Sequence, residues 1–309
     1  MKALRIGTRG SALAMWQAHH IASRLAERRP DIAIDLVEIV STGDRIAKVP
    51  LSEVEGTGFF TAALEQALLD GRVDVAVHSC KDLPVADTAG LTIAAIPARG
   101  PVEDVLVARD GLTLAALPPG ARLGTCSLRR TAQLRARRPD LEFLPLRGNV
   151  PRRVDLVGRG DLDAIVLARA GLVRLGLDAH ITEVFSVVDL IPAPAQGALA
   201  VQCRIEDEAI QALLADLDDV QTRRAVTAER TVLHVLGGGC SVPVGAAATV
   251  ERDWIELAVG VFDLAGGLAV RADVRGSEPT VVGESAARLL LERGAARLLA
   301  ECATAGGHA

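Results

Sequence analysis

The chain has 309 residues and a formal net charge of -5, with 34 Lys and Arg against 39 Asp and Glu. A chain of this length exceeds one ordinary core, so two or three domains are expected. Half of the residues are hydrophobic and only 2% are aromatic, which predicts aliphatic cores. The negative charge and the scarcity of stacking side chains argue against nucleic-acid binding.

No segment is typical of a signal peptide or of a membrane-spanning helix. The N-terminal MKALRIGTRGS reaches a charged residue after every few apolar ones, and no apolar run approaches the roughly 20 residues that a span needs. The five cysteines are scattered and lack CxxC spacing, which argues against a disulfide framework or a zinc site. We therefore expect a cytoplasmic protein with no metal and no membrane partner. We also expect a monomer, although no residue pattern bears on the oligomeric state.

Short β-branched runs alternate with amphipathic helical stretches through about the first 215 residues. The helices between these runs begin at Ser11, near Phe60 and at Ser127. This alternation is typical of α/β units on mostly parallel sheets. The predicted strands cover 3–8, 32–40, 73–79, 104–109, 141–147, 162–168 and 198–204.

Two segments rich in Pro and Gly interrupt the alternation, IPARGPVED at 96–104 and IPAPAQG at 191–197. A chain that leaves one lobe and later returns to it builds two lobes with a cleft between them, and such clefts are favoured ligand sites. We predict that the first lobe comprises 1–98 and 198–216 and that the second comprises 103–192.

From residue 220 the pattern changes. A helix is predicted over about 220–236, then three strands within 244–275 and a closing helix over about 282–303, with a hairpin turning at Gly266 and Gly267. These elements predict a small α+β domain over 220–309. Its glycine loop, VLGGGCSVPVG, presents Cys240, either as a nucleophile or as an ordinary small buried side chain.

Polar and basic side chains follow several predicted strands. Lys81 and Asp82 come directly after the strand at 73–79, a ligand position in open α/β sheets, although a solvated turn is the alternative. In GTCSLRR, Ser127 caps a helix whose first turns carry Arg129 and Arg130. Arginines at or near other strand ends indicate a polyanionic ligand with several carboxylates. They are Arg9, Arg147, Arg153 and Arg174, while Arg135, Arg137 and Arg138 are interpreted as a solvated helix face.

Seven segments in this order resemble the porphobilinogen deaminase family, also called hydroxymethylbilane synthases. They are TRGSALAMWQA, VAVHSCKDLP, GTCSLRR, LRGNV, AGLVRLGL, PAQGALAVQCR and GGGCSVPVG, and they run over nearly the whole chain. The resemblance implies two lobes like type II periplasmic binding proteins, the first discontinuous, and a C-terminal α+β domain with a three-stranded antiparallel sheet. It also implies a transferase that joins four porphobilinogen molecules head to tail, releases ammonia and hydrolyses off hydroxymethylbilane for tetrapyrrole biosynthesis.

The resemblance also assigns roles to residues. Cys240 would hold a dipyrromethane primer by a thioether, and Asp82 would be the catalytic carboxylate, stabilising the cationic azafulvene left when ammonia departs. Besides Cys240 and Asp82, the implied cofactor-binding residues are Lys81, Thr125, Ser127, Arg129, Arg130 and Gly148. The implied substrate-binding residues are Arg9, Ser11, Phe60, Arg147, Arg153, Arg174 and Gln196.

Some positions depart from the family pattern. Thr57 and Ala62 stand where lysines are usual in a lid loop, Cys126 replaces a serine, and APAQG replaces A-V-G-Q-G, which stiffens a possible hinge. We expect an active enzyme with altered lid behaviour. The alternatives are a non-catalytic two-lobed polycarboxylate-binding module, a thiol enzyme that pairs Cys240 with His234, and an inactive relative.

Overall fold

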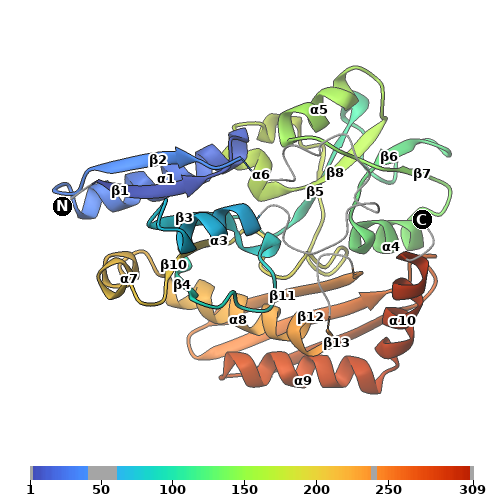
Figure 1. Ribbon diagram of the computed structural model, residues 1–309. Coiled ribbons are helices and arrows are strands. Elements are labelled where there is room, and N and C mark those ends of the chain that lie inside the picture. The colour runs from blue at the N-terminus through green and yellow to red at the C-terminus, as the bar shows by residue number, and fades with distance from the viewer. Residues whose placement is uncertain (1–2, 41–60, 238–241, 307–309) are drawn as a thin grey trace. The chain divides into compact units, whose positions relative to one another are not determined.

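The computed structural model describes residues 3–40, 61–237 and 242–306 (Figure 1). The chain forms two compact units, which we call unit 1 (1–100 with 197–223) and unit 2 (101–196 with 224–309). None of the helices within the described ranges is long and apolar enough to cross a membrane. The further division of unit 2 into a second lobe and a C-terminal domain stays a prediction.

The first sheet of the chain lies in unit 1 and has five strands in the order β2-β1-β3-β10-β4. β1 pairs in parallel with β2 and β3, whereas β10 runs antiparallel to β3 and β4. The sheet is therefore mixed rather than mostly parallel, because β10 enters without the crossover helix that a parallel strand needs. The elements are β1 (Leu4–Thr8), α1 (Ala12–Arg28), β2 (Ile34–Glu38), α3 (Ala62–Leu69), β3 (Val75–Ser79), η2 (Cys80–Asp82), β4 (Leu91–Ala95), β10 (Leu199–Arg204) and α7 (Glu208–Ala215).

Unit 2 contains a second five-stranded sheet with the same arrangement, in the order β7-β6-β8-β5-β9. β6 is parallel to β7 and β8, and β5 is antiparallel to β8 and β9. In each sheet the antiparallel fourth strand, β10 or β5, follows a passage of the chain between the units. The elements are β5 (Asp104–Ala108), β6 (Arg122–Gly124), α4 (Leu128–Arg137), β7 (Glu142–Leu144), α5 (Val150–Gly158), β8 (Ala164–Ala168), α6 (Arg169–Arg174) and β9 (Glu183–Val184).

The C-terminal part of unit 2 is a three-stranded antiparallel sheet packed against helices (Figure 1). α8 and α9 touch closely, since a Cβ on Gly283 would lie 2.5 Å from the carbonyl oxygen of Ala228. The predicted single closing helix is wrong: Gly294, at a φ of 96°, separates two helices. The elements are α8 (Val220–Val235), β11 (Val244–Glu251), β12 (Trp254–Phe262), β13 (Ala269–Gly276), α9 (Pro279–Glu292) and α10 (Ala295–Gly306).

The predicted fold class is confirmed: two α/β sheets are followed by a small antiparallel sheet with its helices. Within unit 2 the turn between β12 and β13 rests on α4. Gly266 has a φ of 83°, and a Cβ there would lie 2.8 Å from the backbone nitrogen of Ala136. Phe262 packs with Ala132 and Ile191 in a buried apolar cluster that joins the two sheets of this unit.

One buried carboxylate, Asp104, joins β5 to α4. Its Oδ2 lies 2.7 Å from Nη1 of Arg129 and its Oδ1 lies 2.7 Å from Nη2 of Arg130. Gln196 donates from Nε2 to the same Oδ1 at 2.9 Å and to the Val102 carbonyl at 2.8 Å. Burial raises the pKa of Asp104, but the two guanidinium groups outweigh burial and hold that pKa well below its ordinary value of 3.8.

A second buried carboxylate, Glu229 of α8, holds the segment before β10. It accepts hydrogen bonds from the backbone nitrogens of Ala195 at 2.6 Å and Ala248 at 2.7 Å. Ala195 has a φ of 61°, in the left-handed region where a Cβ costs about 1–2 kcal/mol. This buried alanine occupies the glycine position of the A-V-G-Q-G pattern, so the chain holds a strained conformation there that glycine adopts freely.

Ala195→Gly is expected to change the free energy of unfolding by less than about 0.5 kcal/mol, because relief of the left-handed strain offsets the lost methyl burial and the added freedom of the unfolded chain. Ala212→Gly, at an exposed position inside α7, should cost about 1 kcal/mol as the matched control. Urea unfolding of both variants measures the difference. Equal losses would show that Ala195 is not strained.

Asp104→Asn should lower the free energy of unfolding by about 3–5 kcal/mol, because it leaves two buried guanidinium groups without their anion. The control is the neighbouring Glu103→Gln, which breaks a half-exposed pair with Arg169 at 3.2 Å and should cost less than about 1 kcal/mol. Since the folded-state pKa of Asp104 is depressed, its contribution is present above pH 3.8 and is lost on further acidification. Urea unfolding at pH 7 and below pH 3.8 tests both statements; similar losses for the two variants would contradict them.

Candidate functional site

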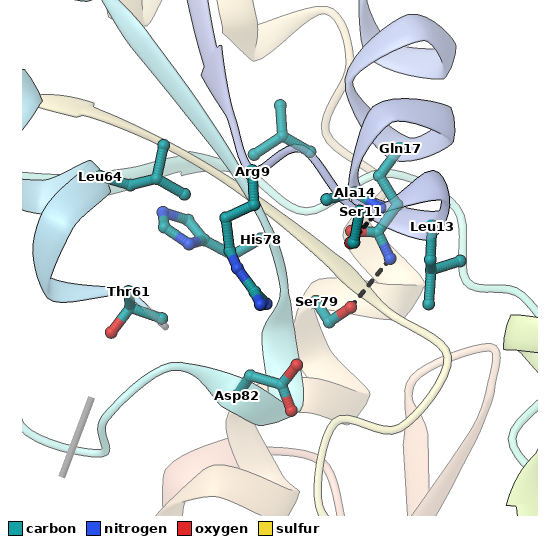
Figure 2. Close-up of a pocket in the computed structure, with 11 residues that line it drawn as sticks. Arg9, Ser11, Leu13, Ala14, Gln17, Thr61, Leu64, His78, Ser79 and Asp82 are labelled. Atoms are coloured by element: carbon teal, nitrogen blue, oxygen red, sulfur yellow. Dashed lines mark hydrogen bonds between the residues drawn. The ribbon is translucent and has the colours of Figure 1, made fainter. Parts of the chain in front are cut away.

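Polar side chains at the carboxyl ends of β1 and β3 line a pocket in unit 1 (Figure 2). The two strands are parallel neighbours, so their ends meet at one edge of the sheet, where ligands bind in open α/β folds. The space between these side chains amounts to ≈ 440 Å³ when the part that is open to solvent is included. Its described lining residues are Arg9, Ser11, Leu13, Ala14, Gln17, Thr61, Leu64, Val77, His78, Ser79 and Asp82.

Arg9 and Ser11 owe their place to the tight passage from β1 into α1. Ser11 caps the helix and accepts a hydrogen bond from the Ala14 backbone nitrogen at 3.3 Å. The Thr8 hydroxyl donates to the Ala14 carbonyl at 3.0 Å and fastens the strand end to the first helical turn. The structure brings Arg9, Ser11 and Asp82 together in the lining of this pocket, and their predicted roles stay predictions.

Asp82 lies in the short helix η2, which begins directly after β3. Two backbone hydrogen bonds shape this turn: Cys80 donates to the Ala198 carbonyl at 3.0 Å and Leu83 donates to the Cys80 carbonyl at 3.2 Å. Figure 2 shows the side chains of Arg9, which follows β1, and Asp82, in the turn after β3, in the lining of the pocket. The site therefore offers one fixed cation and one exposed carboxylate to a single ligand.

The pocket also contains residues that the sequence did not single out. Gln17 donates from Nε2 to the Ser79 hydroxyl at 2.8 Å, the dashed contact in Figure 2, and joins α1 to the end of β3. His78 is 4% exposed and lines the same pocket. Gln17 lies four residues before the buried Ile21 on α1, and His78 directly follows the apolar residues of β3. These spacings are the only signals that point to them.

Thr125 and Ser127 of unit 2 lie directly before the first residue of α4. The Ser127 hydroxyl accepts a hydrogen bond from the Arg130 backbone nitrogen at 3.4 Å, and the Thr125 hydroxyl accepts one from the Ser127 nitrogen at 3.2 Å. Cys126 bridges to β7's following loop, with its Sγ 2.9 Å from the Leu146 carbonyl oxygen and 3.1 Å from the Leu146 nitrogen. The Cys126 thiol therefore contacts both backbone polar groups of Leu146, as a small polar side chain can.

The loop from Arg147 into α5 presents the next predicted residues. Gly148 has a φ of 103°, a conformation that favours glycine, and a Cβ there would lie 3.0 Å from Cδ of Arg152. Arg153 donates from Nε to the Gly148 carbonyl at 2.7 Å. In α6, burial lowers the pKa of Arg174 to about 10. A desolvated guanidinium of this kind favours an anionic partner.

Arg129 and Arg130 take part in a buried ion pair, and their predicted role in cofactor binding stays a prediction. Both are buried, at 3% and 8% exposure, and bind Asp104 together with Gln196. Of the nitrogens of these two guanidinium groups, Nε of Arg129 is buried without a hydrogen-bond partner among the described atoms. Asp104 itself went unnoticed in the sequence, where its single signal is a charged residue at the start of an otherwise apolar strand.

The interpretation of the later α4 arginines as a solvated face is wrong for two of them. Arg135 donates to the Leu264 carbonyl at 2.7 Å and lies 5.2 Å from the centre of the Phe143 ring. Arg138 donates to the Leu117 carbonyl at 2.8 Å and pairs with Asp140 at 2.6 Å. Long side chains on a helix face fasten neighbouring loops here rather than standing in solvent.

Cys240, Phe60 and Thr57 lie outside the described residues. His234, the base of the thiol-enzyme alternative, is exposed in the last turn of α8. Lys81 lies in η2 beside Asp82. Within the described ranges, no group of three or more His, Cys, Asp or Glu side chains is placed to hold a metal ion. The donors that the structure does offer are guanidinium, ammonium, hydroxyl and backbone N–H groups, which are the partners that carboxylates take.

Two family models match the chain in order. Residues 4–212 match "Porphobilinogen deaminase, dipyromethane cofactor binding domain", and residues 223–292 match "Porphobilinogen deaminase, C-terminal domain". Among solved structures, a periplasmic binding protein of Salmonella typhimurium with high arginine specificity gives a TM-score of 0.43 at 14% identity, covering 70% of this chain and 92% of that chain.

Curated relatives named porphobilinogen deaminase extend over nearly the full chain. The protein of Roseiflexus sp. (strain RS-1) is 47% identical over 299 residues, covering 96% of this chain and 98% of the relative. That of Brevibacillus brevis is 45% identical and covers 96% of both, and that of Xanthomonas campestris pv. campestris (strain B100) is 46% identical and covers 97% and 100%. With both family domains matched in order and full-length relatives at this identity, the chain belongs to the porphobilinogen deaminase family.

Proposed function

We propose that this chain is a hydroxymethylbilane synthase, which condenses four porphobilinogen molecules head to tail on a dipyrromethane primer, releases four ammonia molecules and frees hydroxymethylbilane by hydrolysis. The observation that carries the proposal is the pocket in which Asp82 and Arg9 flank one small-molecule volume. Porphobilinogen has both kinds of group that such a pair recognises: carboxylates for the guanidinium, and a pyrrole N–H with an aminomethyl group for the carboxylate.

Asp82 supplies the electrostatics of the reaction. When the carbon–nitrogen bond of the aminomethyl group breaks and the nitrogen leaves as ammonia, the pyrrole nitrogen gives its lone pair to the ring, and positive charge develops on the resulting azafulvene. A fixed carboxylate beside the pyrrole N–H lowers the energy of that cation more than that of the neutral ring. The same oxygen can receive the proton that the ring loses when aromaticity returns after carbon–carbon bond formation.

Arg9 and Ser11 bind the substrate's carboxylates and hold the ring against Asp82. A guanidinium and a capping hydroxyl at the start of α1 offer directed donors, and the amino end of a helix favours negative charge. Gln17 and Ser79 are fixed by their mutual hydrogen bond, which limits the rotation of the pocket wall. Precise placement of the aminomethyl carbon against its nucleophile is a large part of the rate enhancement in such a condensation.

The donors present fit a dipyrromethane group, whose pyrroles carry acetate and propionate side chains. We propose that Cys240 holds it by a thioether and that Lys81, Thr125, Ser127, Arg129, Arg130 and Gly148 bind it. When bound, the group supplies the nucleophilic pyrrole carbon that starts the chain. Arg147, Arg153 and Arg174 are proposed to bind carboxylates of the growing product, with Gln196 and Phe60 as further substrate contacts. The desolvated Arg174 and the buried, unpartnered Nε of Arg129 support an anionic ligand in unit 2.

The proposed enzyme acts in the cytoplasm as a monomer. Thr57 and Ala62 remove two positive charges from the expected lid. Ala62, the first residue of α3, is not among the described residues that line the pocket. The polycarboxylate-binding module is the weaker proposal, because a pure carboxylate sensor has no use for an exposed carboxylate such as Asp82 in its pocket.

The intact mass of the denatured protein tests the covalent primer. The purified chain should exceed its polypeptide mass by that of one dipyrromethane, and Cys240→Ser should show the bare mass, because a serine hydroxyl does not form the thioether. Cys302→Ser, in the C-terminal helix α10, is the control and should keep the added mass. A bare mass in all three proteins after incubation with porphobilinogen would refute the proposal.

Asp82→Asn should reduce kcat for hydroxymethylbilane formation by about 100-fold or more, because the amide keeps the shape of the side chain and loses its charge. Asp87→Asn, an exposed acid in the same loop, is the matched control and should stay within about twofold of the wild type. Rates are measured per mole of primed enzyme, from the mass spectrum. A kcat for Asp82→Asn near that of the control would remove Asp82 from the catalytic role.

A further inference from the structure

His78 lies in β3, four residues before Asp82, and its backbone is opposite Ala200 of β10. The side chain is 4% exposed and forms part of the pocket wall between Leu64 and Arg9 (Figure 2). None of the roles assigned above uses it. A buried imidazole in the wall of a polar pocket requires an account of its two nitrogens, since each is a strong hydrogen-bonding group.

A series of hydrogen-bonded polar side chains lies behind His78. Glu65 of α3 accepts from the Thr88 hydroxyl at 2.9 Å and from Nε2 of Gln202 at 3.0 Å. Because the amide nitrogen of Gln202 is bound to Glu65, its Oε1 is turned to the other side. Oε1 of Gln202 and Nε2 of His78 are both buried, and neither makes a hydrogen bond of ordinary geometry. Gln202 nevertheless lies close enough to His78 to raise its pKa.

These polar side chains determine which imidazole nitrogen of His78 carries the proton. An amide oxygen only accepts, so the atom facing it must be the protonated nitrogen, Nε2. Burial lowers the pKa of His78 to about 4 despite the opposing effect of Gln202, and Arg9 lowers it further, so that the ring is neutral near pH 7. A neutral ring protonated at Nε2 has its lone pair on Nδ1.

We propose that His78 is a further substrate-contacting residue of the proposed synthase, whose Nδ1 accepts a hydrogen bond from the aminomethyl nitrogen of porphobilinogen, with Gln202 and Glu65 as positioning residues that hold its tautomer. The inference rests on the proposed function. In the deamination step the carbon–nitrogen bond breaks, the bonding pair leaves with nitrogen as ammonia, and the pyrrole nitrogen supplies the electrons of the azafulvene. His78 gains and loses no proton in this step; it orients the leaving group.

The charges around the pocket agree with a neutral acceptor. Arg9 from the end of β1 and Asp82 from η2 share the pocket with His78, and Glu65 lies behind it on α3. An imidazolium at this place would add a second cation beside Arg9 and repel the protonated aminomethyl group. A lone pair on Nδ1 binds that group and leaves Asp82 for the pyrrole N–H.

Two substitutions separate this role from a merely structural one. His78→Asn places its Oδ1 near the position of Nδ1 and has nothing at Nε2, whereas His78→Gln reaches the Nε2 position and has no acceptor at Nδ1. We expect kcat per primed enzyme to fall about 100-fold for His78→Gln and by less than about 10-fold for His78→Asn, with KM little changed in both. A purely structural link to Gln202 gives the reverse order and would overturn the proposal. His180→Gln, on the exposed η4 turn (Asp178–His180), is the control.

The ¹⁵N chemical shifts of the imidazole in the wild-type holoenzyme give a second readout that does not depend on how the variants fold. They should show His78 neutral at pH 7 with its proton on Nε2, and Gln202→Leu should relax that preference. A proton on Nδ1 in the wild type would overturn the proposal even if both variants fail to fold. Failure of the wild type to form hydroxymethylbilane would instead contradict the proposed function itself.

Discussion

The parallel pairing of β1 with β3, and of β6 with β8, is the constraint on which the remaining structure depends. Parallel neighbours end at the same edge of their sheet, so whatever follows each strand in sequence is brought to one place. In unit 1 that arrangement brings Arg9 and Asp82, more than 70 residues apart, into one pocket. The helices that follow β1 and β6, α1 and α4, begin with serine-capped first turns, which place serine hydroxyls and backbone N–H groups at the same edge.

Buried anions stabilise both units beneath these edges. Asp104 in unit 2 neutralises two guanidinium groups, and Glu65 in unit 1 accepts hydrogen bonds from Gln202 and Thr88. In a poorly solvated interior each such group restricts its neighbours to one orientation, because any other arrangement leaves a polar atom unpaired. Burying these charged groups costs free energy, but it also fixes the positions of side chains near the proposed ligand.

The sequence predicts the elements with strong patterns and misses those defined by contacts made elsewhere. Ser11 and Ser127 are recognisable helix caps, and the apolar run of β3 followed by Asp82 marks a sheet edge. The three-residue β6 and the two-residue β9 are too short to show a period, and the direction of β10 depends on the route of the chain between units. Asp104 and His78 look like interruptions of apolar strands until the arginines and Gln202 opposite them are known.

The contact between Gly266 and the backbone of α4 limits how the two sheets of unit 2 can diverge in sequence. Where a turn packs directly on a helix backbone, the backbone cannot become smaller. A larger residue in the turn therefore cannot be compensated by a smaller residue on the helix. Compensating substitutions are therefore unavailable at this joint, while they remain open at the neighbouring packing of Phe262 against Ala132. The orientation of the C-terminal sheet on α4 should consequently be inherited with little change, even where the surfaces of both have drifted apart.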